Sequence, residues 1–193
     1  MTDDGIGRLL VASLHQSIGD VLPQRLEYYE HWLSPMGLRE GRSGLAPLTA
    51  VLSFLRQEGE APYTQVMRTA GRYSAEWHDA QRRGDAARLW PRGIRRRLAL
   101  RRARAVIVAA YAPHRVTTAV RRGAGSVVVQ GSVFCTLRER WPWPTCAYFA
   151  GAVDRQLALR GMAAGVGIAE CRAQGAGQCS LSIDFEVVPP EEA

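Results

Sequence analysis

The spacing of hydrophobic residues along this chain changes near residue 113. This change limits the possible fold classes more than any other feature. Before it, apolar residues recur at helical spacing, as Leu10, Leu14 and Ile18 do within 8–22. After it, apolar and polar residues alternate, most clearly over 179–187. The sequence therefore predicts helices first and an antiparallel sheet later.

Helices are expected over most of the first half, and strands are expected in two pairs in the second half. The expected helices are 8–22, 23–33, 45–59, 62–83, 91–112 and, between the strand pairs, 146–161. The expected strands are 115–123, 126–134, 164–173 and 179–187, in hairpins whose turns contain glycine. This order favours an α+β fold in which N-terminal helices pack on a C-terminal antiparallel sheet of about four strands.

The length of 193 residues suits one domain with a full hydrophobic core. We expect a helical half at 1–112, a sheet-containing half at 113–188 and a frayed tail at 189–193. The start lacks the pattern of a secretory signal, and the longest apolar run, 105–112, is far shorter than the roughly 20 residues that span a bilayer. We therefore expect a cytoplasmic protein.

Four cysteines lie in the last third of the chain, at Cys135, Cys146, Cys171 and Cys179. Their spacing alone is a weak metal signal, and burial as small apolar residues is the alternative. The predicted elements strengthen the metal interpretation, because Cys171 ends one strand, Cys179 begins its partner and Cys146 stands at a helix start, where the helix dipole favours a thiolate. These thiolates could hold zinc, with Cys135 or Glu170 as the fourth ligand. A disulfide between Cys171 and Cys179 is disfavoured in a reducing cytosol.

The net charge is +7, and the chain contains arginine but no lysine. Seven arginines fall within 92–104, at Arg92, Arg95, Arg96, Arg97, Arg101, Arg102 and Arg104. A solvated helix face is the plainest interpretation of this cluster. The alternatives are an anionic ligand, a partner protein or peripheral contact with an acidic membrane surface. Nucleic acid is the least favoured partner, because no helix-turn-helix or aromatic stacking motif accompanies the arginines.

The segments "PTCAYFAGAVDRQLALRG" and "VGIAECRAQGAGQCSLSIDF" resemble the C-terminal signature of the 4-vinyl reductase domain family. That signature has a cysteine before a helix with small residues, a strand ending E-x-x-C, and a glycine-containing turn before another cysteine. The resemblance is strongest over 125–187. The segment "LWPRGIRRRLALRRA" with the later "GSVFC" further resembles the bacteriochlorophyll-synthesis branch of the family.

The resemblance implies a TRAPP-subunit-like domain, usually a homodimer formed through helices, with an apolar pocket between helices and sheet. Members of the family bind aromatic effectors, acyl chains or tetrapyrroles. The regulators among them hold zinc with three cysteines, which match Cys146, Cys171 and Cys179, and with a glutamate. This chain has Ile168 at the glutamate position, so either Cys135 replaces that ligand or zinc is absent.

The motifs of common enzyme classes are missing from this sequence, including a lysine-bearing P-loop, H-E-x-x-H and G-x-S-x-G. We therefore expect a binding domain rather than an enzyme, with a tetrapyrrole, an aromatic molecule or an acyl chain as ligand. The alternatives are a scaffold subunit of a larger complex without exchangeable ligand, and a vinyl reductase or accessory factor of (bacterio)chlorophyll synthesis.

The residues expected to contact the ligand are aromatic, except for one histidine. They are Trp77, His78, Tyr111, Phe134, Tyr148 and Phe149. The wider set adds Phe54, Met67, Tyr73 and Val108. The same residue types also form ordinary cores, which is the competing interpretation of each. His78 and His114 are the leading candidates for an axial ligand of a metal tetrapyrrole, since imidazole is a common metal ligand.

Overall fold

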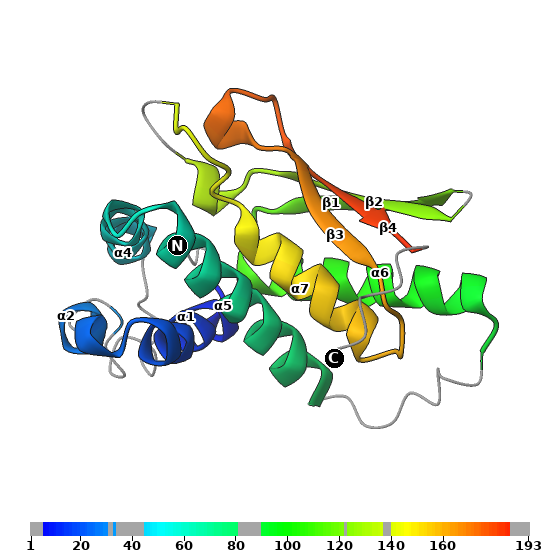
Figure 1. Ribbon diagram of the computed structural model, residues 1–193, viewed down its shortest axis with the longest axis horizontal. Coiled ribbons are helices and arrows are strands. Elements are labelled where there is room, and N and C mark those ends of the chain that lie inside the picture. Colours follow the sequence, from blue (N-terminus) through cyan, green and yellow to red (C-terminus); the bar gives the residue numbers. More distant parts are fainter. Residues whose placement is uncertain are drawn as a thin grey trace, which may run out of the picture.

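Helices come first along the chain and strands follow, which confirms the predicted α+β class (Figure 1). The computed structural model describes residues 6–30, 33, 45–80, 90–121, 123–136 and 140–185. The helices are α1 (Arg8–Val21), η1 (Pro23–Arg25), α2 (Leu26–Glu30), α4 (Leu45–Gln57), α5 (Glu60–Ala80), α6 (Arg92–Ala110), η3 (Val133–Cys135), α7 (Ala147–Ala158) and η4 (Arg172–Gln174). The strands are β1 (Arg115–Arg121), β2 (Ala124–Gln130), β3 (Gly165–Glu170) and β4 (Cys179–Asp184).

The four strands form one antiparallel sheet in the order β1-β2-β4-β3. Val127 of β2 pairs with Thr118 on one side and with Leu181 on the other. The face that carries Val127, Leu181 and Ile183 is buried against the helices, whereas Ser182 on the opposite face is exposed. The alternation predicted for the last strand is therefore the alternation of a sheet with one buried face.

The strand predicted over 126–134 is wrong in its second half. β2 ends at Gln130, Gly131 has a φ of 72°, and the chain then enters the 3-10 helix η3. The β-branched and aromatic residues that continue to Phe134 look like strand in sequence, but the glycine turns the chain off the sheet. As a result Phe134 and Cys135 point into the core from a turn.

Several other expectations need adjustment at their ends. Residues 23–33 begin as η1 and continue as the short helix α2, and α5 begins at Glu60 instead of 62. The final strand ends at Asp184. The tail at 189–193, residues 34–44 and His31 lie outside the described residues.

Helix α7 lies between α5 and the sheet and is almost wholly buried (Figure 1). Two glycines allow this close approach. A Cβ atom at Gly71 of α5 would overlap the carbonyl oxygen of Tyr148, and one at Gly151 of α7 would overlap the carbonyl oxygen of Arg68. The two helices thus meet backbone to backbone, so the position of α7 over the sheet is fixed tightly.

Helix α6 packs through small and branched residues and leaves its other side open. Ala99, Ala103 and Ile107 are fully buried, whereas Ile94 and Val108 are exposed large apolar residues. Among the described helices, none combines the length and the apolar composition needed to cross a lipid bilayer.

Candidate metal centre and its surroundings

Four buried cysteine sulfurs converge at one end of the sheet. Cys135 ends η3, Cys146 is the N-cap of α7, Cys171 directly follows β3, and Cys179 is the first residue of β4. Their Sγ atoms all lie within 4.8 Å of one another. Cys135 Sγ lies 3.4 Å from Cys179 Sγ and 3.5 Å from Cys171 Sγ. The structure therefore brings together the four residues that the sequence offers as metal ligands.

The cluster has the donor set and dimensions of a structural zinc site. A Zn–S distance of about 2.3 Å in a tetrahedron places neighbouring sulfurs about 3.8 Å apart. Two of the separations are 3.4 and 3.5 Å and all lie within 4.8 Å, so the cluster has nearly the size that zinc requires. Four sulfur ligands would close the coordination sphere, and a closed sphere is typical of structural rather than catalytic zinc.

The four thiols are coupled to one another through hydrogen bonds between their sulfurs. Hydrogen bonds from Cys135, Cys146 and Cys179 hold the pKa of the Cys171 thiol well below its usual range. Hydrogen bonding to Cys135, and then to the other two cysteines, raises the pKa of Cys146. A bound metal ion would replace these shared protons.

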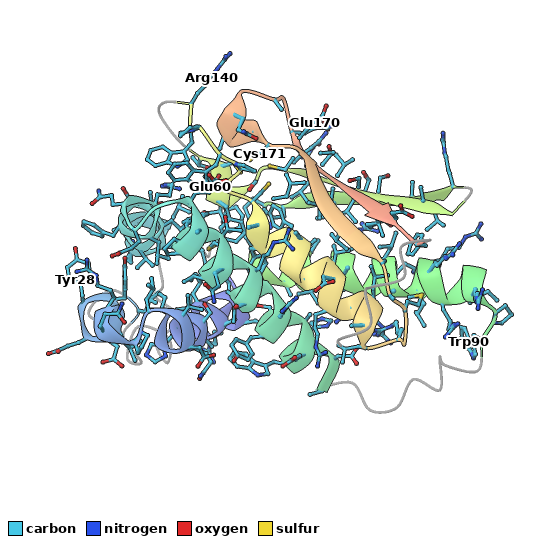
Figure 2. All side chains as sticks on the ribbon, in the orientation of Figure 1. Tyr28, Glu60, Trp90, Arg140, Glu170 and Cys171 are labelled. Carbon is cyan, nitrogen blue, oxygen red and sulfur yellow. The ribbon has the colours of Figure 1, made fainter. Side chains whose placement is uncertain are left out.

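Glu170 does not belong to the cluster. The β3–β4 pairing contains an irregularity between Ile168 and Glu170, yet Glu170 still pairs with Ser180. Its Oε2 accepts a hydrogen bond of 3.0 Å from Ser180 Oγ, and its side chain is exposed (Figure 2). Of the two candidates for a fourth ligand, the structure places Cys135, and not Glu170, beside the other sulfurs.

A buried polar network surrounds the cysteines, and sequence reasoning did not identify it. Thr145 Oγ1 donates to the Phe134 carbonyl at 2.9 Å and lies 3.3 Å from Cys135 Sγ. Tyr63 OH donates to the Thr145 carbonyl at 2.8 Å. Arg56 Nη1 lies 3.5 Å from the same Phe134 carbonyl. The sequence feature that could have indicated this network is Arg56, the single charged residue in the sequence of α4.

Four of the six predicted ligand-contacting residues gather around His114. The ring of His114 lies 4.9 Å from Tyr111 and 5.3 Å from Phe149. Phe134 contacts both Phe149 and Tyr148, at 5.2 and 4.9 Å. Phe134, Tyr148 and Phe149 have no exposed surface, so they fill the space between helices and sheet as core residues.

His114 is held as a neutral core histidine. Val133 N–H donates to Nε2 at 3.3 Å, which leaves the proton on Nδ1 to donate to the Ile107 carbonyl at 3.1 Å. Burial lowers the pKa of His114 to about 4. Because both ring nitrogens are engaged, His114 offers no free nitrogen as an axial ligand.

The other two predicted ligand-contacting residues, Trp77 and His78, lie elsewhere. Tyr63, beside the cysteines, and Trp77 are separated by about 21 Å along α5 at the helical rise. The Trp77 ring stacks on Tyr73 with centroids 5.4 Å apart, and the Tyr73 hydroxyl bonds to Asp20 of α1. The prediction placed these residues in one pocket because local periodicity gives the face of a helix but not the position of a neighbour along it.

An aromatic hollow of about 400 Å³ lies between α2 and α4. Its lining residues are Arg25, Tyr28, Tyr29, Phe54, Gln57 and Glu58. The ring of Tyr28 meets Phe54 edge-on at 5.4 Å and Tyr29 at 5.3 Å. Arg25 Nε pairs with Glu58 Oε1 at 3.1 Å. The hollow therefore combines aromatic walls with one charged pair.

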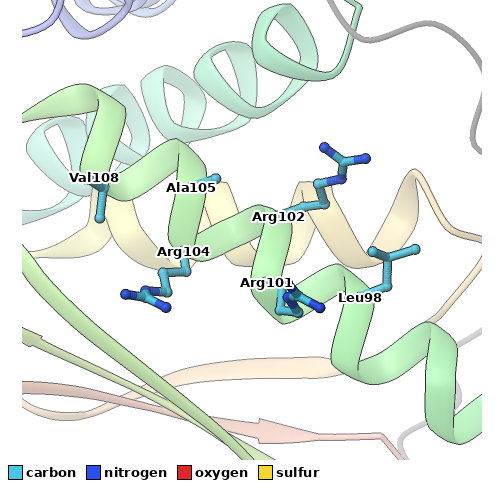
Figure 3. A pocket seen from close by; sticks show the side chains of 6 residues that line it. All are labelled: Leu98, Arg101, Arg102, Arg104, Ala105 and Val108. Atoms are coloured by element: carbon cyan, nitrogen blue, oxygen red, sulfur yellow. The ribbon is translucent and has the colours of Figure 1, made fainter.

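A second hollow, of about 560 Å³, lies against the open face of α6 (Figure 3). Its lining residues are Leu98, Arg101, Arg102, Arg104, Ala105 and Val108. Along the helix the three arginines lie between Leu98 on one side and Ala105 and Val108 on the other. The surface is thus both cationic and partly apolar.

No protein-family model and no curated protein matches this chain. Among solved structures, the chain is similar to the phenol-responsive sensory domain of the transcription activator PoxR, crystallised with phenol. The two share 18% identity over 73% of this chain and 74% of that chain, with a TM-score of 0.50. An H-NOX variant aligns over 94% of this chain and 96% of its own, with 12% identity and a TM-score of 0.45, too low to carry an argument. The PoxR similarity supports the α+β fold of the chain.

Proposed function

We propose that this chain is a small-molecule-binding domain of the sensory type, related to the 4-vinyl reductase family, with a structural zinc ion held by its four cysteines. The observation that carries the proposal is the convergence of the four sulfurs. Three of them, from Cys146, Cys171 and Cys179, occupy the positions that the family resemblance assigns to zinc ligands. The fold similarity to a phenol-responsive domain supports the same conclusion.

The zinc ion would fasten the β3–β4 hairpin to the start of α7. The hairpin contributes two sulfurs, the helix start contributes one and η3 contributes one. Among the described residues, the hairpin is also bonded to the loop before α7, where Trp141 N–H donates to the Ala173 carbonyl at 2.7 Å and the Pro142 carbonyl accepts from Gln174 Nε2 at 3.3 Å. The metal therefore has a structural task, namely to hold one end of the sheet against the helices.

The ligand class that the described surface fits best is a small aromatic molecule with a polar group. The space between helices and sheet is filled by Phe134, Tyr148 and Phe149. The hollow between α2 and α4 is open and has aromatic walls, and its volume lies within the range of ligand sites. The Arg25–Glu58 pair at this hollow could bond to a hydroxyl or carboxyl group.

Calorimetric titration with phenol, haem and palmitate tests the ligand class. We expect saturable binding of phenol, weakened in a Phe54→Ala variant and unchanged in a Trp77→Ala control. Saturable binding of haem or palmitate with no response to phenol would overturn the aromatic assignment. No binding in any arm would favour a scaffold subunit, and turnover of a vinyl tetrapyrrole with a nicotinamide cofactor would favour a reductase.

A second candidate function, docking on an anionic membrane surface, is supported by the open face of α6. Residues 86–138 contain twelve arginines and no acidic residue. Arg97, Arg101 and Arg104 are exposed and belong to none of the ion pairs among the described residues. Exposed Trp90 and Ile94 extend the apolar part of this surface. Arginines beside exposed apolar residues suit an anionic lipid interface.

Vesicle sedimentation separates this candidate from general basicity. We expect binding to vesicles that contain phosphatidylglycerol and none to phosphatidylcholine alone. The test variant carries glutamate at Arg97, Arg101 and Arg104. The control carries the same charge changes at Arg8, Arg140 and Arg172. Equal loss of binding in both variants, or a preference for duplex DNA over the vesicles, would overturn membrane docking.

A further inference from the structure

Arg56 is a buried cation without a carboxylate partner among the described residues. The exposed fraction of Arg56 is 5%. Its contacts there include the Phe134 carbonyl, 3.5 Å from Nη1, the Trp141 ring, whose centroid lies 5.8 Å from the guanidinium carbon, and the side chain of Tyr63. A buried charge costs several kcal/mol unless an opposite charge or a full set of hydrogen bonds compensates it.

Arg160 shows how this protein pairs a buried guanidinium elsewhere. Arg160 is 3% exposed, and its Nη2 lies 2.8 Å from Asp79 Oδ1. Its Nη1 donates to Gln156 Oε1 at 2.7 Å. Arg160 therefore has a carboxylate of its own, and the contrast raises the question of which group balances Arg56.

Among the described residues, the groups that interact with Arg56 and can carry negative charge are Tyr63 and Cys135 of the cysteine cluster. Burial raises the pKa of Tyr63 far above its usual range, so its hydroxyl stays neutral. Burial lowers the pKa of Arg56, while Tyr63 and then Cys135 raise it again. With zinc bound, the cysteine thiolates would be the negative charges of this buried region among the described residues.

The link between Arg56 and the cluster is short and buried. The Phe134 carbonyl that faces Arg56 also accepts from Thr145 Oγ1, which lies 3.3 Å from Cys135 Sγ. Cys135 follows Phe134 directly in the chain. Arg56 belongs to α4, which contributes no cysteine, so it connects a further helix to the site.

We propose that Arg56 is the counter-charge of the cysteine metal centre and that it sets the affinity of this centre for zinc. Four thiolates on one Zn²⁺ leave about two surplus negative charges in a buried place. One guanidinium beside them offsets about half of that charge. This inference rests on the proposed zinc site and assigns to Arg56 a positioning and electrostatic role, without direct contact with the metal.

Zinc affinity, measured by competition with a chromophoric chelator, tests this role. In Arg56→Gln, which removes the charge, we expect zinc affinity to fall roughly 10–100-fold, as is typical of groups that surround the ligands. Arg56→Lys retains the charge and should stay within a few-fold of the wild type. Arg160→Gln removes the other buried guanidinium and should leave zinc affinity unchanged.

Each outcome decides a different point. If Arg56→Gln binds zinc as tightly as the wild type, the counter-charge role is wrong while the zinc site stands. If the wild type itself binds no zinc, the proposed metal centre fails first. If Arg56→Gln does not fold, Arg56→Lys decides: zinc affinity within a few-fold of the wild type supports the role of the charge, whereas a roughly 10–100-fold loss with the charge retained would overturn the proposal.

Discussion

Cys135 Sγ lies 3.4 Å from Cys179 Sγ, although the two residues are 44 positions apart in the chain. Cys135 reaches this position because β2 ends at Gln130 and Gly131 turns the chain inward. Cys179 reaches it as the first residue of β4, on the buried face of the strand. The closed sulfur cluster therefore depends on the early end of one strand and on the start of another.

Replacing Cys135 tests which residue is the fourth ligand. In Cys135→Ser the number of thiolates falls from four to three, so zinc affinity should fall by more than the roughly 10–100-fold typical of surrounding groups. Glu170→Gln is the matched control, because Glu170 bonds to Ser180 away from the sulfurs. Chelator competition measures both. Loss of zinc in the glutamate variant alone would contradict the four-cysteine assignment.

Removing the metal should loosen the β3–β4 hairpin before the rest of the fold. The hairpin supplies two of the four sulfurs, whereas α5 and α7 are held by direct backbone packing. Zinc at a thousand times its dissociation constant adds about 4 kcal/mol to the free energy of unfolding. Hydrogen exchange with and without chelator should show faster exchange over 171–179 and little change in α7. Uniform acceleration across both regions would argue against a local fastening role.

Adding one methyl group to the α5–α7 contact should destabilise the fold strongly. In Gly151→Ala the new Cβ overlaps the carbonyl of Arg68, so the helices must separate, at a cost of about 3 kcal/mol or more. Gly93→Ala is the control, because a Cβ there meets nothing within 4 Å and alanine favours the helix by up to about 1 kcal/mol. Urea denaturation measures both changes. Equal stability of the two variants would mean that the helices do not meet at their backbones.

His114 should make the fold less stable in mild acid. Its pKa falls from an ordinary value of 6.5 to about 4 on folding, because burial disfavours the charged ring. The unfolded chain therefore binds the proton more readily between these values. The contribution of neutral His114 to the free energy of unfolding is complete above about pH 6.5. It is lost as the pH falls towards 4, and the total loss is up to about 3 kcal/mol.

The pH dependence of unfolding in wild type and His114→Gln measures this contribution. The variant should lose much of the decline between pH 6.5 and 5, whereas a variant of surface His15 should keep it. An identical decline in wild type and His114→Gln would assign the acid sensitivity to other groups.

The local spacing of apolar residues was enough to predict which segments are helices or strands and which face of each is buried. The inward residues of α7, such as Phe149 and Val153, and the alternation of β4 follow from spacing within one segment. The spacing within one segment does not indicate which distant segment it contacts. The choice of Cys135 over Glu170 needed the path of the chain after Gly131.

The surroundings of the cysteines show the same limit. Arg56 lies 78 positions from its carbonyl partner Phe134. Its only local signal is that of a lone charge in an apolar helix. Trp77 is separated from the aromatic core because other elements pack on α5 at different points along its length. A single sequence does not show where these points are.

Native mass spectrometry of protein purified without chelator tests the central claim most directly, because it reports metal, bound molecules and subunit number together. We expect one zinc ion per chain in the wild type and none in a Cys171→Ser/Cys179→Ser variant. Wild-type protein with less than about half an equivalent of zinc would contradict a structural metal centre, since such a site fills as the chain folds.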